Sequence, residues 1–406
     1  MADMLAGNKK SFFAAISLPA IFTVTMVLFP LLDVVESPFS GFSLGTVAVL
    51  ISEFALIAFS GKHEVRIGSI SCFVLYAFCM SLVLLLSGVQ IYSEGGLPTA
   101  LLRLFKFALI VLPVFLFSLH KSVNVHLAFK VVRLVCIISS LYVMIQQVFL
   151  AVGIVVPNAF TQVAASDLYL TSGFGVEGSS SFRPSGLFLE PSHMSQYCLP
   201  FLLWQAFDPV KSEKRLPFLI VVSLGVVLTG SGMGVLGVAA ILLAYFVSKA
   251  GKNALMIFAI AALFFISLLA FQTDFMQSVM ERLFTANVSG GGNAFEARIG
   301  NGMEIYFAKD IVVQIFGSGF GNVPASYMNG LEYVLNTLGI VGVVLLVASS
   351  ISAAMRFEAW GKMVILLYFV LLLGAQVFTA ATFSFYCILA YLSAKRSSAR
   401  KRADAA

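Results

Sequence analysis

The chain consists, over most of its length, of apolar runs that are each about as long as a membrane-spanning helix. One of them, residues 67–91, contains no charged residue. A helix needs about 20 apolar residues to cross the hydrocarbon core of a bilayer. Hydrophobic residues make up 60% of the 406 residues and charged residues only 11%, against about 25% charged residues in soluble domains. The sequence excludes a water-soluble globule and predicts an all-α, polytopic integral membrane protein.

Hydropathy and helix-breaking residues predict about 12 transmembrane helices, in a single integral membrane domain over residues 1–406. Two apolar runs are each divided into two spans, one at Thr229–Gly232 and one near Thr379. The predicted spans cover residues 11–32, 39–60, 67–91, 99–119, 127–152, 194–207, 216–230, 233–248, 253–272, 331–351, 362–377 and 380–394. The run after Lys9 and Lys10 is too long for a cleavable signal, so we expect a retained first span.

The distribution of charge predicts the orientation of the chain. Lysine and arginine gather in cytoplasmic loops, and with the N-terminus inside, 19 of the 25 basic residues fall on the cytoplasmic side. The two faces then carry about +13 and −6, so most of the net charge of +6 is an orientation signal and indicates no nucleic-acid partner. We therefore expect both termini to be cytoplasmic, with a basic tail over residues 395–406.

Two predicted outer segments, residues 153–193 and 273–330, are long enough to form large periplasmic loops, and loops of this size are usually functional or disordered. In the second loop, Phe295, Ile299 and Met303 recur at helical spacing, which is typical of a helix lying at the membrane interface. The chemistry is therefore expected on the outer face.

Histidine, cysteine and paired aspartates give no sign of a metal site. The four histidines and five cysteines are scattered along the chain, and no two aspartates are close enough for the metal site with which many glycosyltransferases hold a nucleotide diphosphate. The sequence therefore predicts no metal and no cofactor.

The densest polar cluster is RPSGLFLEPSH, residues 183–193, where the first large loop returns to the membrane. Arg183 can hold a phosphate through two parallel hydrogen bonds, and a partly desolvated Glu190 can act as a general base. In the structural alternative, Arg183 pairs with Glu190, and Ser192 caps the following helix. The residues alone leave both interpretations open.

Four other basic residues on the predicted outer side are candidates for substrate binding. Arg298, with Arg282 before it, can meet either an anionic substrate or lipid headgroups. Arg103 and Lys106 share one helix face just below the outer surface, where a buried cation requires an anionic partner or a water-filled cavity, unless the long side chains snorkel to the interface. The buried acid Glu53 is either a proton site or, as we favour, a structural partner for a neighbouring helix.

RPSGLFLEPSH resembles the Arg-x-Ser-Gly-x-Phe-x-Glu-Pro-Ser signature of bacterial O-antigen and exopolysaccharide polymerases of the Wzy type. TGSGMG, residues 229–234, is similar to the serine-rich turn of that family, with Met233 in place of its usual arginine. Arg298 followed by FGSGFGN, residues 316–322, resembles the outer arginine and Gly-x-Gly-x-Gly run of the same family.

A fourth pattern is shared with the related O-antigen ligases. Asn329 followed by Gly339-Ile340-Val341-Gly342 is similar to their His-Asn-x9-Gly-x-x-Gly pattern, but Met328 stands where the ligases have histidine. This departure favours a polymerase over a ligase. The resemblance covers roughly residues 180–345 and the overall topology.

The resemblance implies a metal-independent glycosyltransferase that polymerises undecaprenyl-diphosphate-linked oligosaccharide repeat units at the periplasmic face of the bacterial inner membrane, in O-antigen or related surface-polysaccharide biosynthesis. Its expected partners are the lipid-linked donor and acceptor, membrane lipids, a chain-length regulator and a flippase. The alternatives are an O-antigen ligase or another lipid-linked glycan transferase and, from a different class, a secondary transporter with Glu53 as its proton site.

The resemblance also suggests roles for the outer residues. The expected roles are diphosphate binding for Arg183 and Arg298, extension of that basic site by Arg103 and Lys106, deprotonation of the acceptor hydroxyl by Glu190 with His193 as the alternative base, and substrate binding by Arg282 and Asn329.

Overall fold

A computed structural model describes residues 17–39, 41–59, 65–160, 183–207, 215–250, 301–324 and 328–404. This part of the chain is helical, and its only extended pairing is an isolated bridge between Glu36 and Ser43. The helices are α2 (Leu18–Leu32), α3 (Leu44–Phe59), α4 (Ser69–Leu86), α5 (Gly96–Leu116), η1 (Leu119–Ser122), α6 (Val125–Ala151), α8 (Pro191–Phe207), α9 (Arg215–Leu228), α10 (Gly232–Ala250), α14 (Asn301–Phe307), α15 (Ile311–Phe316), α16 (Gly330–Ala354), α17 (Ala359–Gly374) and α18 (Ala380–Asp404).

Every predicted span coincides with one of these helices except residues 253–272, which lie outside the described part of the chain. The predicted break at Thr229–Gly232 is confirmed, because α9 ends at Leu228 and α10 begins at Gly232. The break near Thr379 is confirmed in the same way, between α17 and α18. The helix α18 continues through the basic residues 395–404, beyond the predicted end of its span.

Four helices among the described residues are long and apolar enough to cross a membrane, namely α4, α5, α6 and α16. Shorter apolar helices surround them, including α2, α3 and α17. Large apolar side chains such as Ile51 and Val148 are exposed on the helix surfaces, with 65% and 68% of their surface accessible, as expected for side chains that face lipid. These features indicate a membrane-embedded protein.

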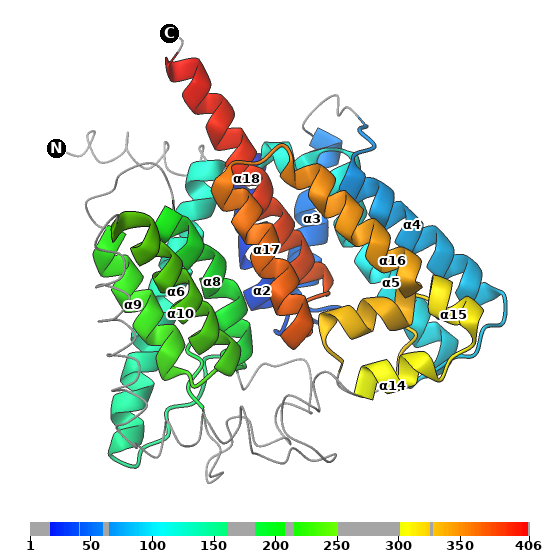
Figure 1. Cartoon of the computed structure of the whole chain (residues 1–406), viewed down its shortest axis with the longest axis horizontal. Helices are drawn as coiled ribbons and strands as arrows, with labels where there is room; N and C mark the ends of the chain where they lie inside the picture. Colours follow the sequence, from blue (N-terminus) through cyan, green and yellow to red (C-terminus); the bar gives the residue numbers. More distant parts are fainter. Residues whose placement is uncertain are drawn as a thin grey trace, which may run out of the picture.

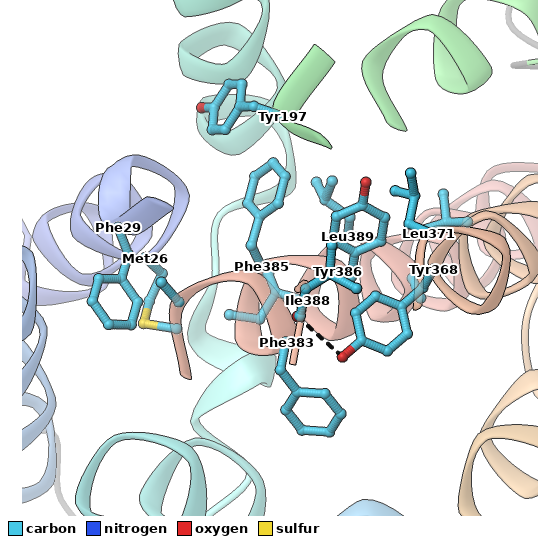
Figure 2. Close-up of a cluster of buried hydrophobic side chains, with 14 of the residues drawn as sticks. Met26, Phe29, Tyr197, Tyr368, Leu371, Phe383, Phe385, Tyr386, Ile388 and Leu389 are labelled. Atoms are coloured by element: carbon cyan, nitrogen blue, oxygen red, sulfur yellow. Dashed lines mark hydrogen bonds between the residues drawn. The ribbon is translucent and has the colours of Figure 1, made fainter. Parts of the chain in front are cut away.

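The helix α8 lies inside the bundle and is buried on nearly all sides, packing against α9, α10, α17 and α6. A helix that is apolar around its whole circumference is typical of such a central position. Beside α8, the first turns of α18 carry a cluster of aromatic side chains. Figure 2 shows Phe385 pointing toward Tyr197 of α8, with Met26 and Phe29 of α2 on one side and Tyr368 of α17 on the other. The Tyr197 and Phe385 rings stack with centroids 4.7 Å apart.

The helix ends define two ends of the bundle. We call the one that carries α14, α15 and the beginnings of α8 and α16 the α14 end; the C-terminal part of α18 projects from the opposite end (Figure 1). The α14 end also carries the turn between α17 and α18. It is the end at which the sequence places its candidate functional residues.

Candidate functional site

The chain just before α8 is held in place by a buried pair of amide side chains. Gln146 Nε2 donates to Asn158 Oδ1 over 3.0 Å. The Asn158 oxygen also accepts from Ser185 N at 2.9 Å, and Gln146 Oε1 accepts from Gly186 N at 3.0 Å. Gly186 has φ +64°, and a Cβ there would lie 2.6 Å from the Ser139 carbonyl oxygen. Only glycine fits this left-handed, close-packed position.

This contact explains the central part of RPSGLFLEPSH. Ser185, Phe188 and Leu189 are at most 3% exposed, so these residues anchor the segment. Arg183, Glu190 and His193 lie on either side of the anchor and are partly exposed. The motif therefore divides into a buried structural part and three flanking polar side chains.

Glu190 immediately precedes the first residue of α8. Its carboxylate accepts a hydrogen bond from Ser192 Oγ at 2.9 Å, and its backbone oxygen accepts from Met194 N at 3.2 Å. Unpaired N–H groups give a helix N-terminus a partial positive charge, which favours a carboxylate at this place. Ser192 donates to Glu190, which differs from the predicted role of Ser192 as the helix cap.

His193 lies one turn into α8 and lines a cavity of about 210 Å³. The cavity opens between the end of α2, the first turns of α8, and the α17–α18 turn with the start of α18. Its polar lining residues are Asp33, His193, Gln196, Gln376, Thr379 and Thr382, and its aromatic lining residues are Tyr197, Phe385 and Tyr386.

Asp33 is fixed from α3. Its Oδ1 atom accepts from Ser43 Oγ and from Thr46 Oγ1, at 2.5 and 3.2 Å. Both bonds fall on the same oxygen, so Oδ2 retains its capacity to accept from a ligand. Asp33 thus adds a fixed carboxylate to the wall of the cavity.

The glycine run FGSGFGN forms a second polar region at the α14 end, where it joins α4, α5 and α16. Asn322 Oδ1 accepts from Tyr92 N at 2.6 Å, and Phe320 N donates to Ser81 Oγ at 2.8 Å. Ser318 N and Gly319 N donate to carbonyls of α16. Since these N–H groups are bonded to protein, the run does not form a phosphate-cradling loop.

The glycine run and the Gly339-x-x-Gly342 pattern meet in space. The helix α16 is interrupted at Gly339, which has φ +68°, and Figure 1 shows it bent into two pieces. Ser318 N donates to Asn336 O at 3.0 Å, and Gly319 N donates to Thr337 O at 2.9 Å. The run therefore satisfies the backbone carbonyls that the interruption leaves without intrahelical partners.

Lys309, between α14 and α15, also contacts this interruption. Its Nζ atom lies 3.3 Å from Asn336 O, 3.4 Å from Ser318 Oγ and 4.6 Å from the centre of the Tyr92 ring. Only 7% of its surface is exposed, and burial lowers the pKa of Lys309 from 10.5 to about 8. Burial, together with Asp310, raises the pKa of Tyr92.

Asn329 is the N-cap of α16. Its side chain accepts from Glu332 N at 2.9 Å, while the Glu332 carboxylate accepts from Asn329 N at 3.1 Å, a reciprocal capping box. Asn329 is 3% exposed and the preceding Met328 is 2% exposed. In this structure the Asn329 side chain has a structural contact; nothing tests its predicted contact with substrate.

Arg103 and Lys106 lie on α5, as the sequence predicts. Arg103 is exposed and donates from Nη1 to Gly321 O over 3.2 Å, while Lys106 is partly buried. Arg103 thus belongs to the region of the glycine run, and Glu190 and His193 to the region of the α8 cavity.

The α17–α18 turn connects these two regions. Ala375 O accepts from Gly330 N at 2.9 Å, next to Asn329, and the following Gln376 lines the cavity with His193. Met233, which replaces the arginine of the resembled family, lies against Gly374 at the end of α17. Arg282, Arg298 and most of the predicted interfacial helix around Phe295 lie outside the described residues.

A scan against protein-family models finds no match to this chain, and no curated protein matches it either. Among the described residues, no three His, Cys, Asp or Glu side chains form a group that could hold a metal ion. Sequence reasoning missed Asp33, Gln376 and Thr379 in the cavity wall, because each looks like an ordinary loop residue at the end of a span. It also missed the role of Lys309, whose only signal is a basic residue between two short apolar stretches.

Proposed function

We propose that this protein is a glycosyltransferase that polymerises lipid-diphosphate-linked oligosaccharide repeat units without a metal ion. The observation that carries the proposal is the start of α8, where His193 lines a cavity with both polar and aromatic walls and Glu190 lies three residues before it. The motif that positions them is also the one that most resembles the Wzy-type polymerases. The donor and acceptor are proposed to be undecaprenyl-diphosphate-linked glycans.

The proposed reaction is a displacement at the anomeric carbon of the donor. A hydroxyl oxygen of the acceptor forms the new bond to that carbon, and the bond from the carbon to the diphosphate oxygen breaks. The electron pair leaves with undecaprenyl diphosphate, and the hydroxyl proton passes to Glu190, with His193 as the alternative base. Arg183, with Arg298, stabilises the charge that grows on the leaving diphosphate, since a guanidinium group can form two parallel bonds to phosphate oxygens.

The proposal includes an orientation. With both termini in the cytoplasm, the α14 end faces the periplasm of a bacterial inner membrane. Support comes from the excess of lysine and arginine in the predicted cytoplasmic loops. A lipid-linked donor fits this placement because it carries its own activated leaving group.

A ligase would transfer a finished glycan to a different acceptor and is the closest alternative. The ligase pattern requires histidine where this chain has Met328, and that side chain packs in the hydrophobic core. No histidine therefore occupies this place, which favours a polymerase.

One observation bears on the transporter alternative. Transporters commonly bind substrates at interrupted helices near the bilayer midplane, and α16 is interrupted at Gly339. Here the interruption lies close to the α14 end, and the carbonyls of Asn336 and Thr337 accept hydrogen bonds from backbone N–H groups of the glycine run. The interruption is thus better explained as a docking point for the glycine run.

The test is to incubate the purified protein with a synthetic undecaprenyl-diphosphate repeat unit and separate the products by size. A ladder of products is expected from the wild type. Arg183→Ala and Glu190→Gln should each abolish the ladder, and Arg183→Lys should not restore it, because lysine cannot form the paired bonds. The matched control is Glu94→Gln, which changes an exposed acid between α4 and α5.

Three results would contradict the proposal. A normal ladder in Arg183→Ala would remove the diphosphate role of this residue. Transfer of a single glycan to an acceptor that carries no diphosphate, without a ladder, would indicate a ligase. Movement of the substrate across a vesicle wall with no new glycosidic bond would indicate a transporter.

A further inference from the structure

The cavity between α2, α8 and α18 has the chemistry of a sugar-binding pocket. Its volume of about 210 Å³ corresponds to about seven water molecules at roughly 30 Å³ each, which is enough for one pyranose ring. We propose that it binds the terminal sugar of the acceptor glycan. This inference rests on the proposed function and identifies the chemical group that the site recognises.

The lining excludes the other groups that a lipid-linked substrate carries. Among the described residues neither lysine nor arginine lines the cavity, so a diphosphate would find no permanent cation from this part of the chain. Six polar side chains line it, and an acyl chain would leave their remaining donors and acceptors without partners, which is costly in a buried place. An uncharged group with many hydroxyls fits both constraints.

Three buried aromatic side chains, Tyr197, Phe385 and Tyr386, form a rigid backing to the cavity. The Tyr197 hydroxyl donates to Val27 O at 2.9 Å, and the Tyr386 hydroxyl donates to Gln196 O at 2.6 Å. Both hydroxyls already bond to the backbone and both rings are at most 2% exposed, so these tyrosines support the cavity wall from behind. Phe385 stacks on Tyr197 at an interplanar angle of 12° and stiffens this wall.

The polar wall is already fixed before a ligand binds. Asp33 is held through Oδ1 by Ser43 and Thr46, which directs its second oxygen to other donors. Thr379 Oγ1 accepts from Thr382 N at 3.2 Å and is thereby fixed at the start of α18. A carboxylate and neutral hydrogen-bonding groups held in this way recognise neighbouring hydroxyls on one ring.

The position of His193 links this pocket to the proposed chemistry. His193 lines the cavity and follows Glu190 by three residues, so both side chains lie at the first turn of α8. A sugar ring in the pocket would therefore be held beside His193, the alternative base, in the same helix turn that follows Glu190. Asp33 and Gln376 are specificity-determining residues in this arrangement and do not take the proton.

Binding can be measured without the reaction. The probes are methyl glycosides of glucose, galactose, N-acetylglucosamine and rhamnose, and their binding to the full-length protein in detergent micelles is followed by saturation-transfer NMR. At least one should bind the wild type, with affinity lowered about tenfold in Asp33→Asn and in Gln376→Leu, as expected for losing one hydrogen bond to the ligand. The matched controls are Glu36→Gln and Gln90→Leu, two exposed residues at the same end of the bundle, and both should bind as the wild type does.

Chain extension provides the second measurement. In Asp33→Asn and Gln376→Leu we expect the KM for the lipid-linked acceptor to rise about tenfold, with kcat changed much less, because the pocket binds a group that does not react. Thermal unfolding at the wild-type temperature shows that the variants are folded.

The outcomes separate the pocket from the proposed function. If no glycoside binds the wild type, or if both variants bind as the wild type does, the pocket assignment is wrong, even where the wild type forms a ladder. If a glycoside binds and both variants weaken it, but the wild type forms no ladder, the pocket stands and the polymerase function fails. Detergent-chain signals in the cavity together with no glycoside binding would assign the cavity to lipid and overturn the inference.

Discussion

The buried amine of Lys309 predicts an unusual dependence of stability on pH. Burial lowers the pKa of Lys309 from 10.5 to about 8 in the folded protein. In the unfolded chain the amine is solvated and keeps its ordinary pKa. Between pH 8 and 10.5 the folded state therefore loses the proton while the unfolded state keeps it, so the free energy of unfolding rises with pH in this window. Below pH 8 both states are protonated and this contribution is constant.

The size of the effect follows from the two pKa values. One unit of pKa corresponds to about 1.4 kcal/mol, so protonated Lys309 costs the folded state about 3 kcal/mol at most, relative to the neutral amine. From pH 7 to pH 9 the free energy of unfolding should rise by about 1.4 kcal/mol, or about 2 to 4 °C in Tm. Tyr92, which lies against the amine, has a raised pKa and stays protonated over this range.

Lys309→Met removes the titrating group while retaining a long apolar side chain. The Asn336 carbonyl keeps its bonds from Ser318 N and Ser318 Oγ, at 3.0 and 2.8 Å, so the change leaves no buried carbonyl without a donor. We expect this variant to be more stable than the wild type at pH 7 and to show no rise in Tm between pH 7 and pH 9. The matched control is Lys130→Met, in which an exposed lysine of α6 is replaced.

The measurement is thermal unfolding of the protein in detergent micelles, followed by tryptophan fluorescence at a series of pH values. A wild-type Tm that stays level or falls from pH 7 to pH 9 would refute the reasoning. So would a rise of equal size in the wild type and in Lys309→Met, because the titrating group would then be elsewhere.

Three further predictions concern the α14 end. Gly339→Ala should lower Tm much more than Gly88→Ala. Both glycines have positive φ, which costs about 1 to 2 kcal/mol for alanine, but a Cβ at Gly339 would also overlap the Ile315 carbonyl, while the space at Gly88 is open. Equal losses of Tm in the two variants would show that the contact between α15 and α16 is not tight. Asn329→Ala should lower the free energy of unfolding by about 1 kcal/mol because it removes the cap. Asn329→Asp should keep both the cap and chain extension. A stable but inactive Asn329→Asp variant would support the predicted role of Asn329 in substrate binding. Chain extension should persist in excess chelator, and its complete loss would contradict the metal-free mechanism.

The helices were predictable from the sequence because apolar run length and turn residues are local signals. The small polar residues Thr229–Gly232 separate α9 from α10 as predicted, since a tight turn needs residues of this kind. The C-terminal extension of α18 was not predictable, because the charged residues 395–404 end the hydrophobic signal without ending the helix. Hydropathy reports burial in lipid, and a helix that leaves the lipid continues without that signal.

The interruption of α16 could not be predicted from the sequence around Gly339. Gly339 lies inside a run that is apolar enough to cross a membrane, and a single glycine in such a run does not signal a break. The break depends on Gly317 and the glycine run, which reach α16 from earlier in the chain and supply donors to its freed carbonyls. Only the tertiary contact makes the left-handed conformation at Gly339 stable.

The same contacts change how the shared motifs are interpreted. Ser185, Asn322 and Asn329 belong to motifs that suggest chemistry, yet each is buried and hydrogen-bonded to other protein groups. These residues are explained by the need to satisfy polar groups inside an apolar bundle. Glu190 and His193 differ from them because both are partly exposed, and His193 lines a cavity.

The buried motif residues stabilise the fold and take no part in the proposed reaction. The motifs alone therefore do not distinguish an active polymerase from an inactive protein of the same fold. The partly exposed groups distinguish them better, because fewer buried contacts hold them in place. If Glu190→Gln and Asp33→Asn leave Tm unchanged, these carboxylates are not needed for folding, and any loss of chain extension then belongs to chemistry or to binding. In the α17–α18 turn, Ala375 O accepts from Gly330 N at the start of α16, while the next residue, Gln376, lines the cavity. A substitution in this turn can therefore change both stability and binding. Unfolding and activity must therefore be measured on the same preparation of each variant.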